Sequence, residues 1–71
     1  MGITIEYMGI RFDDKEAALL QIVFEHKEYE FRKRAMRTLE REGSVAALSC
    51  ITNNHKEYEF RNRAMKALEN R

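Results

Sequence analysis

Hydrophobic and polar positions repeat along this chain with an offset of 29 residues. The segment HKEYEFRKRAMRTLE, at residues 26–40, returns almost unchanged as HKEYEFRNRAMKALE at residues 55–69, and the run AAL at residues 17–19 returns at residues 46–48. Self-similarity at a period of about 20 to 50 residues is typical of stacked repeats, in which one unit cannot bury its apolar face alone. We therefore predict a single domain over residues 1–71, with a leader at residues 1–13, unit 1 at residues 14–42 and unit 2 at residues 43–71.

Helix start and stop signals divide unit 2 into two helices. Gly43 is suited to stop the preceding helix in a left-handed conformation, and Ser44 is a favourable N-cap for the next helix. Asn53 and Asn54 then interrupt the apolar pattern. Asn54 with Glu57 has the form of a capping box, which predicts a second helix over roughly residues 55–70.

Unit 1 carries a weaker break between its two helices. Asp13 with Glu16 predicts the start of its first helix. No Gly, Pro or Asn interrupts the middle of the unit, so one continuous helix over residues 14–42 is the alternative. We favour a break, because an apolar stripe that includes Phe24 meets Lys27 and Glu28 where it should continue. The predicted fold class is all-α, with about four helices in two tandem helix-turn-helix repeats, similar to an α-solenoid, behind a short extended or irregular leader.

The second helix of each unit has an apolar inner face. Its members recur at i, i+4 and i+8 with one methionine beside them: Phe31, Ala35 and Leu39 with Met36, and Phe60, Ala64 and Leu68 with Met65. Tyr29 and Tyr58 lie seven residues before the methionines and share their side of the helix. We interpret these positions as packing between stacked helices rather than as a cofactor site.

Charged residues occupy the other faces of the second helices. Four pairs place an acid four residues before an arginine, a spacing worth about 0.2–0.5 kcal/mol per pair: Glu28–Arg32, Glu30–Arg34, Glu57–Arg61 and Glu59–Arg63. Lys33, Arg37 and Arg41 lack such an acid. A nucleic-acid surface would have to be local, and its candidate residues are Lys33, Arg34, Arg37 and Arg63.

The leader alternates apolar and polar residues in the segment ITIEYMGIRF. This alternation predicts a strand with Ile3, Ile5 and Tyr7 on one side, which would pair with the same strand of another copy. An irregular apolar cap is the alternative. Two units are few for a stacked-repeat fold, so the opposite end, near Met65 and Leu68, is expected to contact a second subunit. We therefore expect a homo-oligomer.

The charge of the chain is nearly balanced, which argues against binding driven by a global electrostatic field. Thirteen Lys and Arg face twelve Asp and Glu within 71 residues, leaving a formal charge of +1. The single cysteine, Cys50, excludes an internal disulfide, fits a reducing compartment and is expected to be buried among apolar neighbours. No signal-peptide pattern or membrane-spanning apolar run is present. We expect a cytoplasmic protein with no membrane partner.

The second helices resemble a known repeat family. FRKRAMRTL and FRNRAMKAL are similar to the VRxxAxxAL signature of HEAT-like repeats, in the short form found in bilin-lyase-type proteins. The matching positions are the apolar residue, the arginine, the small residue and the closing leucine: Phe31, Arg32, Ala35 and Leu39, then Phe60, Arg61, Ala64 and Leu68. Thr38 departs from the family's penultimate alanine, and His26 and His55 stand where the family usually has an aspartate that pairs with neighbouring arginines. The resemblance implies a right-handed stack of helix pairs that binds other macromolecules.

The two histidines raise the question of a metal site. HEAT-like deoxyhypusine hydroxylases hold two metal ions with His and Glu pairs, and the corresponding i, i+4 candidates here are His26 with Glu30 and His55 with Glu59. Each acid also has an arginine four residues later, and a closed metal site needs several converging ligands. We therefore expect no metal and no other cofactor. The sequence shows no Gly-rich phosphate loop, CxxC pair or Ser-His-Asp set, so we expect no catalytic residue.

Our leading hypothesis is a protein-binding or assembly module that is not an enzyme and associates with itself. Its interaction surface would include the leader and the exposed faces of the second helices, with Tyr29, Tyr58 and Met65. One alternative is nucleic-acid binding through the basic candidate residues. A further alternative, suggested only by the resemblance to bilin lyases, is an accessory role in chromophore attachment.

Overall fold

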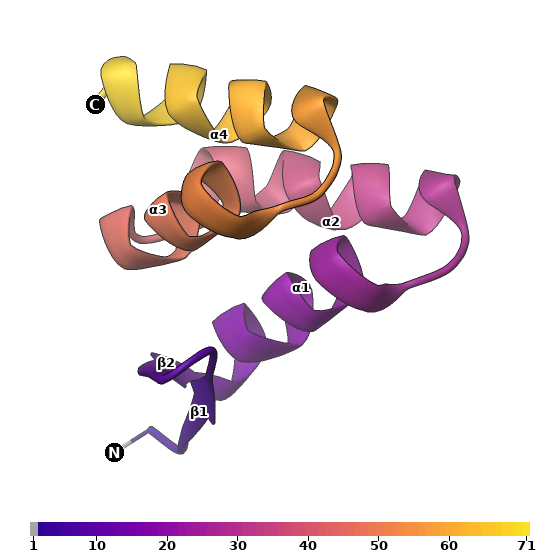
Figure 1. Ribbon diagram of the computed structural model, residues 1–71. Helices are drawn as coiled ribbons and strands as arrows, with labels where there is room; N and C mark the ends of the chain where they lie inside the picture. The colour runs from indigo at the N-terminus through magenta and orange to yellow at the C-terminus, as the bar shows by residue number, and fades with distance from the viewer. Residues whose placement is uncertain (1) are drawn as a thin grey trace.

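The computed structural model describes residues 2–71, and Met1 of the expected leader lies outside them. A two-stranded hairpin, β1 (Thr4–Tyr7) and β2 (Ile10–Asp13), comes before the helices. The helices are α1 (Asp14–Glu25), α2 (Tyr29–Glu42), α3 (Val45–Asn54) and α4 (Tyr58–Glu69). Helix α1 packs against α2 and α3 packs against α4. In Figure 1, α4 lies at the top, α1 lies lowest of the helices beside the hairpin, and α2 and α3 lie between them. The prediction of a mostly helical protein is confirmed.

Both helix pairs turn at a histidine. His26 follows α1 and His55 follows α3, each with an extended backbone, so the predicted break in unit 1 is confirmed and the continuous helix over residues 14–42 is excluded. The predicted capping box of Asn54 and Glu57 is wrong. Asn54 is still helical and its side chain donates to the Cys50 carbonyl, while Glu57 is the N-cap of α4 without a side-chain capping bond. Helix α4 is therefore shorter than predicted at its start.

Two predicted helix starts are confirmed, whereas Gly43 acts differently from the prediction. Asp13 accepts a hydrogen bond from the Glu16 N–H at 2.7 Å, and Ser44 caps α3 in the same way. Gly43 ends α2 in an extended conformation, with φ −69° and ψ 150°, rather than a left-handed one. Glycine is suited to this position because a Cβ there would lie 2.6 Å from the Leu39 carbonyl oxygen.

The leader forms an antiparallel hairpin, so the predictions of a lone strand that pairs between copies and of an irregular cap are both wrong. The two strands pair along their whole length, ending with Tyr7 opposite Ile10. The turn residues Met8 and Gly9 have φ values of 54° and 80°. Positive φ at both central positions is the geometry of a type I′ turn, which matches the twist of the strands.

The hairpin rests on α1. Phe12 of β2 is buried in the core, and the Tyr7 ring lies 6.0 Å from the Phe24 ring. The Tyr7 hydroxyl donates to the Glu25 carboxylate at 2.7 Å. Burial, followed by this hydrogen bond to Glu25, raises the pKa of Tyr7 well above its ordinary value.

The core lies where the two helix pairs meet. Its largest fully buried side chains come from all four helices: Leu20, Val23, Met36, Leu39, Leu48, Ile51 and Phe60. Cys50 is buried, as predicted, and burial raises the pKa of its thiol. Equivalent residues of the two units differ in their exposure to solvent. Met36 is 0% exposed and its counterpart Met65 is 47% exposed, while Phe60 is 0% exposed and its counterpart Phe31 is 42% exposed. The predicted inner-face positions of Phe31 and Met65 are therefore wrong, because each faces away from the other helix pair.

Candidate functional site

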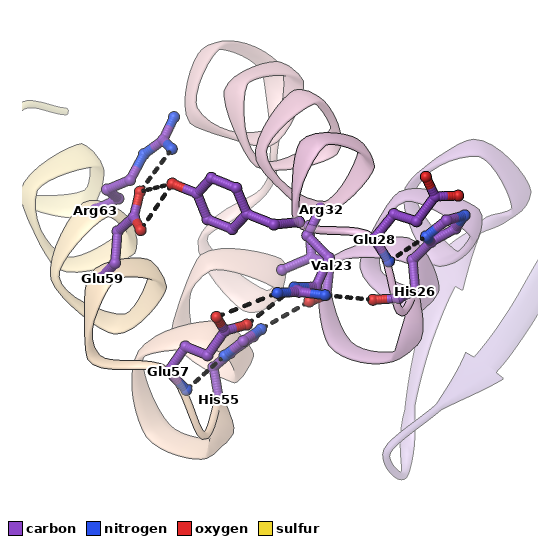
Figure 2. Close-up of polar contacts among 9 residues, drawn as sticks. Val23, His26, Glu28, Arg32, His55, Glu57, Glu59 and Arg63 are labelled. Carbon is purple, nitrogen blue, oxygen red and sulfur yellow. Dashed lines mark hydrogen bonds and ion pairs between the residues drawn. The ribbon is translucent and has the colours of Figure 1, made fainter.

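The loop between the helices of each unit is organised by its histidine. In the first loop, Nδ1 of His26 accepts a hydrogen bond from the Glu28 N–H at 3.0 Å, and the His26 carbonyl accepts one from Arg32 Nη1 at 2.7 Å (Figure 2). The second loop repeats both contacts around His55, at 2.9 Å and 2.8 Å. Because a backbone N–H can only donate, Nδ1 is the acceptor in both rings and the neutral imidazole carries its proton on Nε2. Each histidine thus satisfies backbone groups that the ends of the helices leave unpaired.

The second of these histidines also connects the two units. Nε2 of His55 lies 2.7 Å from the carbonyl oxygen of Val23, in the last turn of α1 (Figure 2). The His55 side chain is 2% exposed, and its ring lies 5.1 Å from the Phe24 ring and 4.9 Å from the Phe60 ring. Nε2 of His26, by contrast, makes no hydrogen bond to any residue among 2–71.

An ion pair crosses between the units beside this histidine. Arg32 Nε lies 2.9 Å from Glu57 Oε1, and Arg32 Nη2 donates to Glu57 Oε2 at 3.3 Å. The Nε contact is an ion pair rather than an aligned hydrogen bond. Glu57 of unit 2 thus supplies the carboxylate for this arginine of unit 1.

A second polar cluster joins the outer parts of α2 and α4. Arg63 donates to both oxygens of Glu40, at 2.8 Å and 2.7 Å, and Tyr29 donates to the Glu59 carboxylate, with 2.7 Å to Oε2. Arg63 also lies 3.6 Å from Glu59 (Figure 2). The hydrogen bond to Glu40 raises the pKa of Arg63, and the hydrogen bond to Glu59 is the main cause of a raised pKa for Tyr29. Arginine and tyrosine therefore keep their protons in this cluster.

Most of the predicted pairs within the second helices are absent. Of the four i, i+4 acid–arginine pairs expected, residues 2–71 contain only Glu59–Arg63. Arg32 contacts the next unit instead, and Glu30 approaches Lys33 at 3.9 Å. A half-buried carboxylate on the neighbouring helix pair is a better partner for an arginine than an exposed carboxylate on the same helix, because it is less screened by solvent and held more rigidly. Sequence reasoning missed Glu40 and Glu57 because nothing in the repeat marks an acid as a contact between units.

Residues of the repeat signature divide between the core and the surface. Ala35, Leu39, Phe60 and Ala64 are buried, Arg32, Arg61 and Leu68 are half-buried, and Phe31 is exposed. The other candidates for interaction, Tyr29, Tyr58 and Met65, are exposed. Tyr29 points at unit 2, whereas Tyr58 and Met65 belong to the surface of α4 that the rest of the described chain leaves uncovered.

The exposed Phe31 belongs to a groove on the outer side of unit 1. We call this feature the open groove, and it is lined by Leu19, Ile22, His26, Phe31, Arg34, Ala35 and Thr38. Its volume is about 290 Å³. Adding the repeat offset of 29 to Leu19, Ile22 and Phe31 gives Leu48, Ile51 and Phe60. Those three residues of unit 2 are completely buried. Sequence reasoning missed Leu19 and Ile22, although the repeat itself could have identified them.

The four basic candidates for nucleic-acid binding do not form one free face. Lys33, Arg34 and Arg37 lie on α2, with Lys33 and Arg34 stacked near the rings of Tyr29 and Phe31. Arg63 is held between α2 and α4 by Glu40 and Glu59. A continuous basic surface that includes Arg63 would require breaking those contacts.

The candidate metal ligands are used in other contacts or lie apart. Both ring nitrogens of His55 are hydrogen-bonded to the backbone, and Glu59 accepts from Tyr29. Within the part of the chain that the structure describes, no three His, Cys, Asp or Glu side chains are grouped as a metal would require. Since no set of ligands converges there, the metal-ligand candidates His26, Glu30, His55 and Glu59 do not lie together as a two-metal site would require.

No helix among residues 2–71 combines the length and the apolar character needed to cross a membrane.

Comparison of the chain with protein-family models, with curated proteins and with solved structures finds no match.

Proposed function

We propose that this chain is a small, non-catalytic helical-repeat module, HEAT-like in its second helices, that binds a protein through the open groove. The single observation that supports the proposal is the contrast between equivalent residues of the two units. Leu48, Ile51 and Phe60 are completely buried, whereas of their counterparts in the open groove Leu19 and Ile22 are half-buried and Phe31 is 42% exposed. A groove built for packing against a helix pair is thus left without one.

The chemistry of the open groove fits a protein surface. Its lining combines aliphatic and aromatic side chains with the polar His26 and the charged Arg34. Apolar side chains accompanied by arginine and other polar groups are typical of interfaces between proteins. The contact between unit 1 and unit 2 indicates what the partner's surface would contain. By analogy with that contact, the partner would present apolar residues flanked by groups that hydrogen-bond to charged side chains.

Photo-crosslinking in the cells that make the protein tests this function. A benzophenone amino acid at position 31 should give adducts that are degraded by protease and resist nuclease. The same amino acid at Val45, which is 62% exposed and lies outside the open groove, is the matched control. Protein adducts at position 31 that are absent at position 45 support the proposal. Nucleic-acid adducts, or none at position 31, contradict it.

A further inference from the structure

Four of the polar links between the two units are formed by residues that recur 29 positions away, on the sides of the units that face away from each other. These four links are Tyr29 to Glu59, Arg32 to Glu57, Glu40 to Arg63 and the Val23 carbonyl to His55. Subtracting 29 from the unit 2 members gives residues beside the open groove: Glu30, Glu28, Arg34 and His26. Adding 29 to the unit 1 members gives residues of unit 2: Tyr58, Arg61, Glu69 and Thr52. Both sides of these four links are therefore present a second time in the same chain, whereas the links from Ser44 to Glu16 and from Arg71 to the Glu40 carbonyl do not recur.

The recurring residues lack the corresponding partners within residues 2–71. Arg34 and Glu69 form no ion pair there, and the Tyr58 hydroxyl makes no hydrogen bond. Nε2 of His26, the equivalent of the His55 nitrogen that reaches Val23, makes no hydrogen bond either. The groups that would complete a second set of links are thus available on opposite sides of the molecule.

On the sides of the two units that face away from each other, the equivalent side chains already have the arrangement found at the internal interface. The His26 and Phe31 rings lie 4.9 Å apart at 51°, and the His55 and Phe60 rings lie 4.9 Å apart at 52°. Arg61 lies 5.7 Å from the centre of the Tyr58 ring, the same distance as Arg32 from Tyr29. Because these side chains already hold the arrangement found at the internal interface, association would require little rearrangement of them.

Apolar residues on the outer side of unit 2 complete the match. Met65 and Leu68 are the counterparts of Met36 and Leu39, which are buried beside unit 2. We define the terminal face by Tyr58, Arg61, Met65, Leu68 and Glu69. The terminal face turns toward solvent the same kinds of side chain that α2 turns toward α4. Met65, for example, is 47% exposed.

We propose that the open groove of one copy binds the terminal face of a second copy, so that copies stack head to tail with the geometry that already joins unit 1 to unit 2. The contact pairs Arg34 with Glu69, Tyr58 with Glu30, Arg61 with Glu28, and His26 with the Thr52 carbonyl. This inference rests on the proposed function and identifies the partner as the chain itself. The two surfaces differ, so the contact is heterologous and leaves a groove and a face free at the two ends for further copies.

The stacked contact is weaker than the internal one and reversible. The internal interface uses three apolar residues of α1, namely Leu20, Val23 and Phe24. The equivalent positions of α3 hold the polar residues Ser49, Thr52 and Asn53. No covalent connection holds the two surfaces together, so association depends on concentration. The hairpin contributes no residue to the lining of the open groove and leaves it accessible.

Exchange of charges between the two surfaces tests the pairing of Arg34 with Glu69. Sedimentation of the wild-type chain over a concentration series should show reversible association. R34E and E69R should each weaken it roughly tenfold or more, because like charges then meet, and the double variant R34E/E69R should restore it. R37E, which changes an exposed arginine of the same helix outside the open groove, is the matched control and should behave as the wild type. A wild-type chain that stays monomeric at millimolar concentration, or a double variant that is no better than the singles, overturns the proposal.

Mixing two blocked variants distinguishes head-to-tail stacking from a symmetric dimer. F31D blocks the open groove and M65D blocks the terminal face, and both side chains are exposed enough for the fold to tolerate the change. Each variant alone should be monomeric, while an equimolar mixture should form a one-to-one dimer, because each supplies the surface that the other lacks. A mixture that remains monomeric overturns the proposal, as does a variant that still dimerises with itself. Crosslinks from position 31 to a different protein, with a monomeric chain, would remove this inference and keep the proposed function.

Discussion

Glu40 of α2 accepts two hydrogen bonds from the guanidinium group of Arg63 in α4, at 2.8 Å and 2.7 Å. Both side chains are only about a quarter exposed, so the pair is partly protected from solvent screening. Arg34 occupies the equivalent position in the first copy of the repeat and forms no ion pair within residues 2–71. The two arginines have nearly the same local sequence, and only Arg63 faces a neighbouring unit.

Truncation of these two arginines should therefore have unequal effects on stability. Arg63→Ala removes both hydrogen bonds and leaves Glu40 half-buried without its partner. We expect the free energy of unfolding to fall by about 1 kcal/mol, measured by urea titration followed by circular dichroism. Arg34→Ala is the matched control and should change it little at protein concentrations where the chain is monomeric. Equal losses for the two variants would mean that the contact between Arg63 and Glu40 adds nothing to stability.

The two phenylalanines of the repeat allow a second comparison. Phe60→Ala opens a cavity in the centre of the core, because this side chain is 0% exposed. A buried Phe→Ala change costs about 3–5 kcal/mol, which should unfold most of a chain of this size. Phe31→Ala removes a side chain that is 42% exposed, and we expect a loss below about 1 kcal/mol. Thermal unfolding of both variants checks the difference, and a stable Phe60→Ala variant would contradict the assignment of the core.

The local features of the fold were predictable from the sequence, since short-range signals determine them. Asp13 and Ser44 were expected at the helix starts because side-chain capping involves neighbours within three residues. The break near His26 followed from the loss of apolar periodicity. The hairpin was missed because Met8 occupies a turn position with positive φ, which methionine rarely adopts.

The contacts between units were not predictable from one unit's pattern. Phe31 and Phe60 have the same neighbours in sequence, and only the position of the unit at one side of the molecule exposes the first and buries the second. Arg32 was assigned to Glu28 by helical spacing, yet the structure gives it Glu57. Spacing along a helix cannot rank a distant carboxylate against a near one, because the competition depends on burial and on the orientation of both side chains.

His55 and His26 provide a third comparison. His55→Ala removes a buried ring that hydrogen-bonds to the Glu57 N–H and to the Val23 carbonyl, so that a part-buried and a buried backbone group lose their partners. We expect a loss of about 2–4 kcal/mol in the free energy of unfolding. His26→Ala removes only the equivalent loop contact and should cost about 1 kcal/mol. Urea titration at one pH measures both variants. A His26→Ala variant as unstable as His55→Ala would show that the link to Val23 is energetically unimportant.

Stability should also fall in alkaline solution, because Tyr7 and Cys50 have raised pKa values in the folded chain. Burial and the hydrogen bond to Glu25 keep the Tyr7 phenol protonated, whereas the unfolded chain loses that proton near the ordinary value of 10.0. The native state then binds more protons than the unfolded state, so the free energy of unfolding decreases as pH rises. For Cys50 the decrease begins near its ordinary value of 9.0.

Replacement of Tyr7 separates the two contributions to this alkaline loss. Tyr7→Phe keeps the ring against Phe24 and removes the ionisable group and its hydrogen bond. We expect Tyr7→Phe to lose less stability than the wild type between about pH 8 and about pH 10.5, because the variant lacks the Tyr7 phenol, whose proton the fold holds. Glu25→Gln retains a hydrogen-bond acceptor without the charge and should give an intermediate slope. Urea titrations at several pH values measure the slopes. Identical slopes for Tyr7→Phe and the wild type would show that ionisation of the Tyr7 phenol is not coupled to folding.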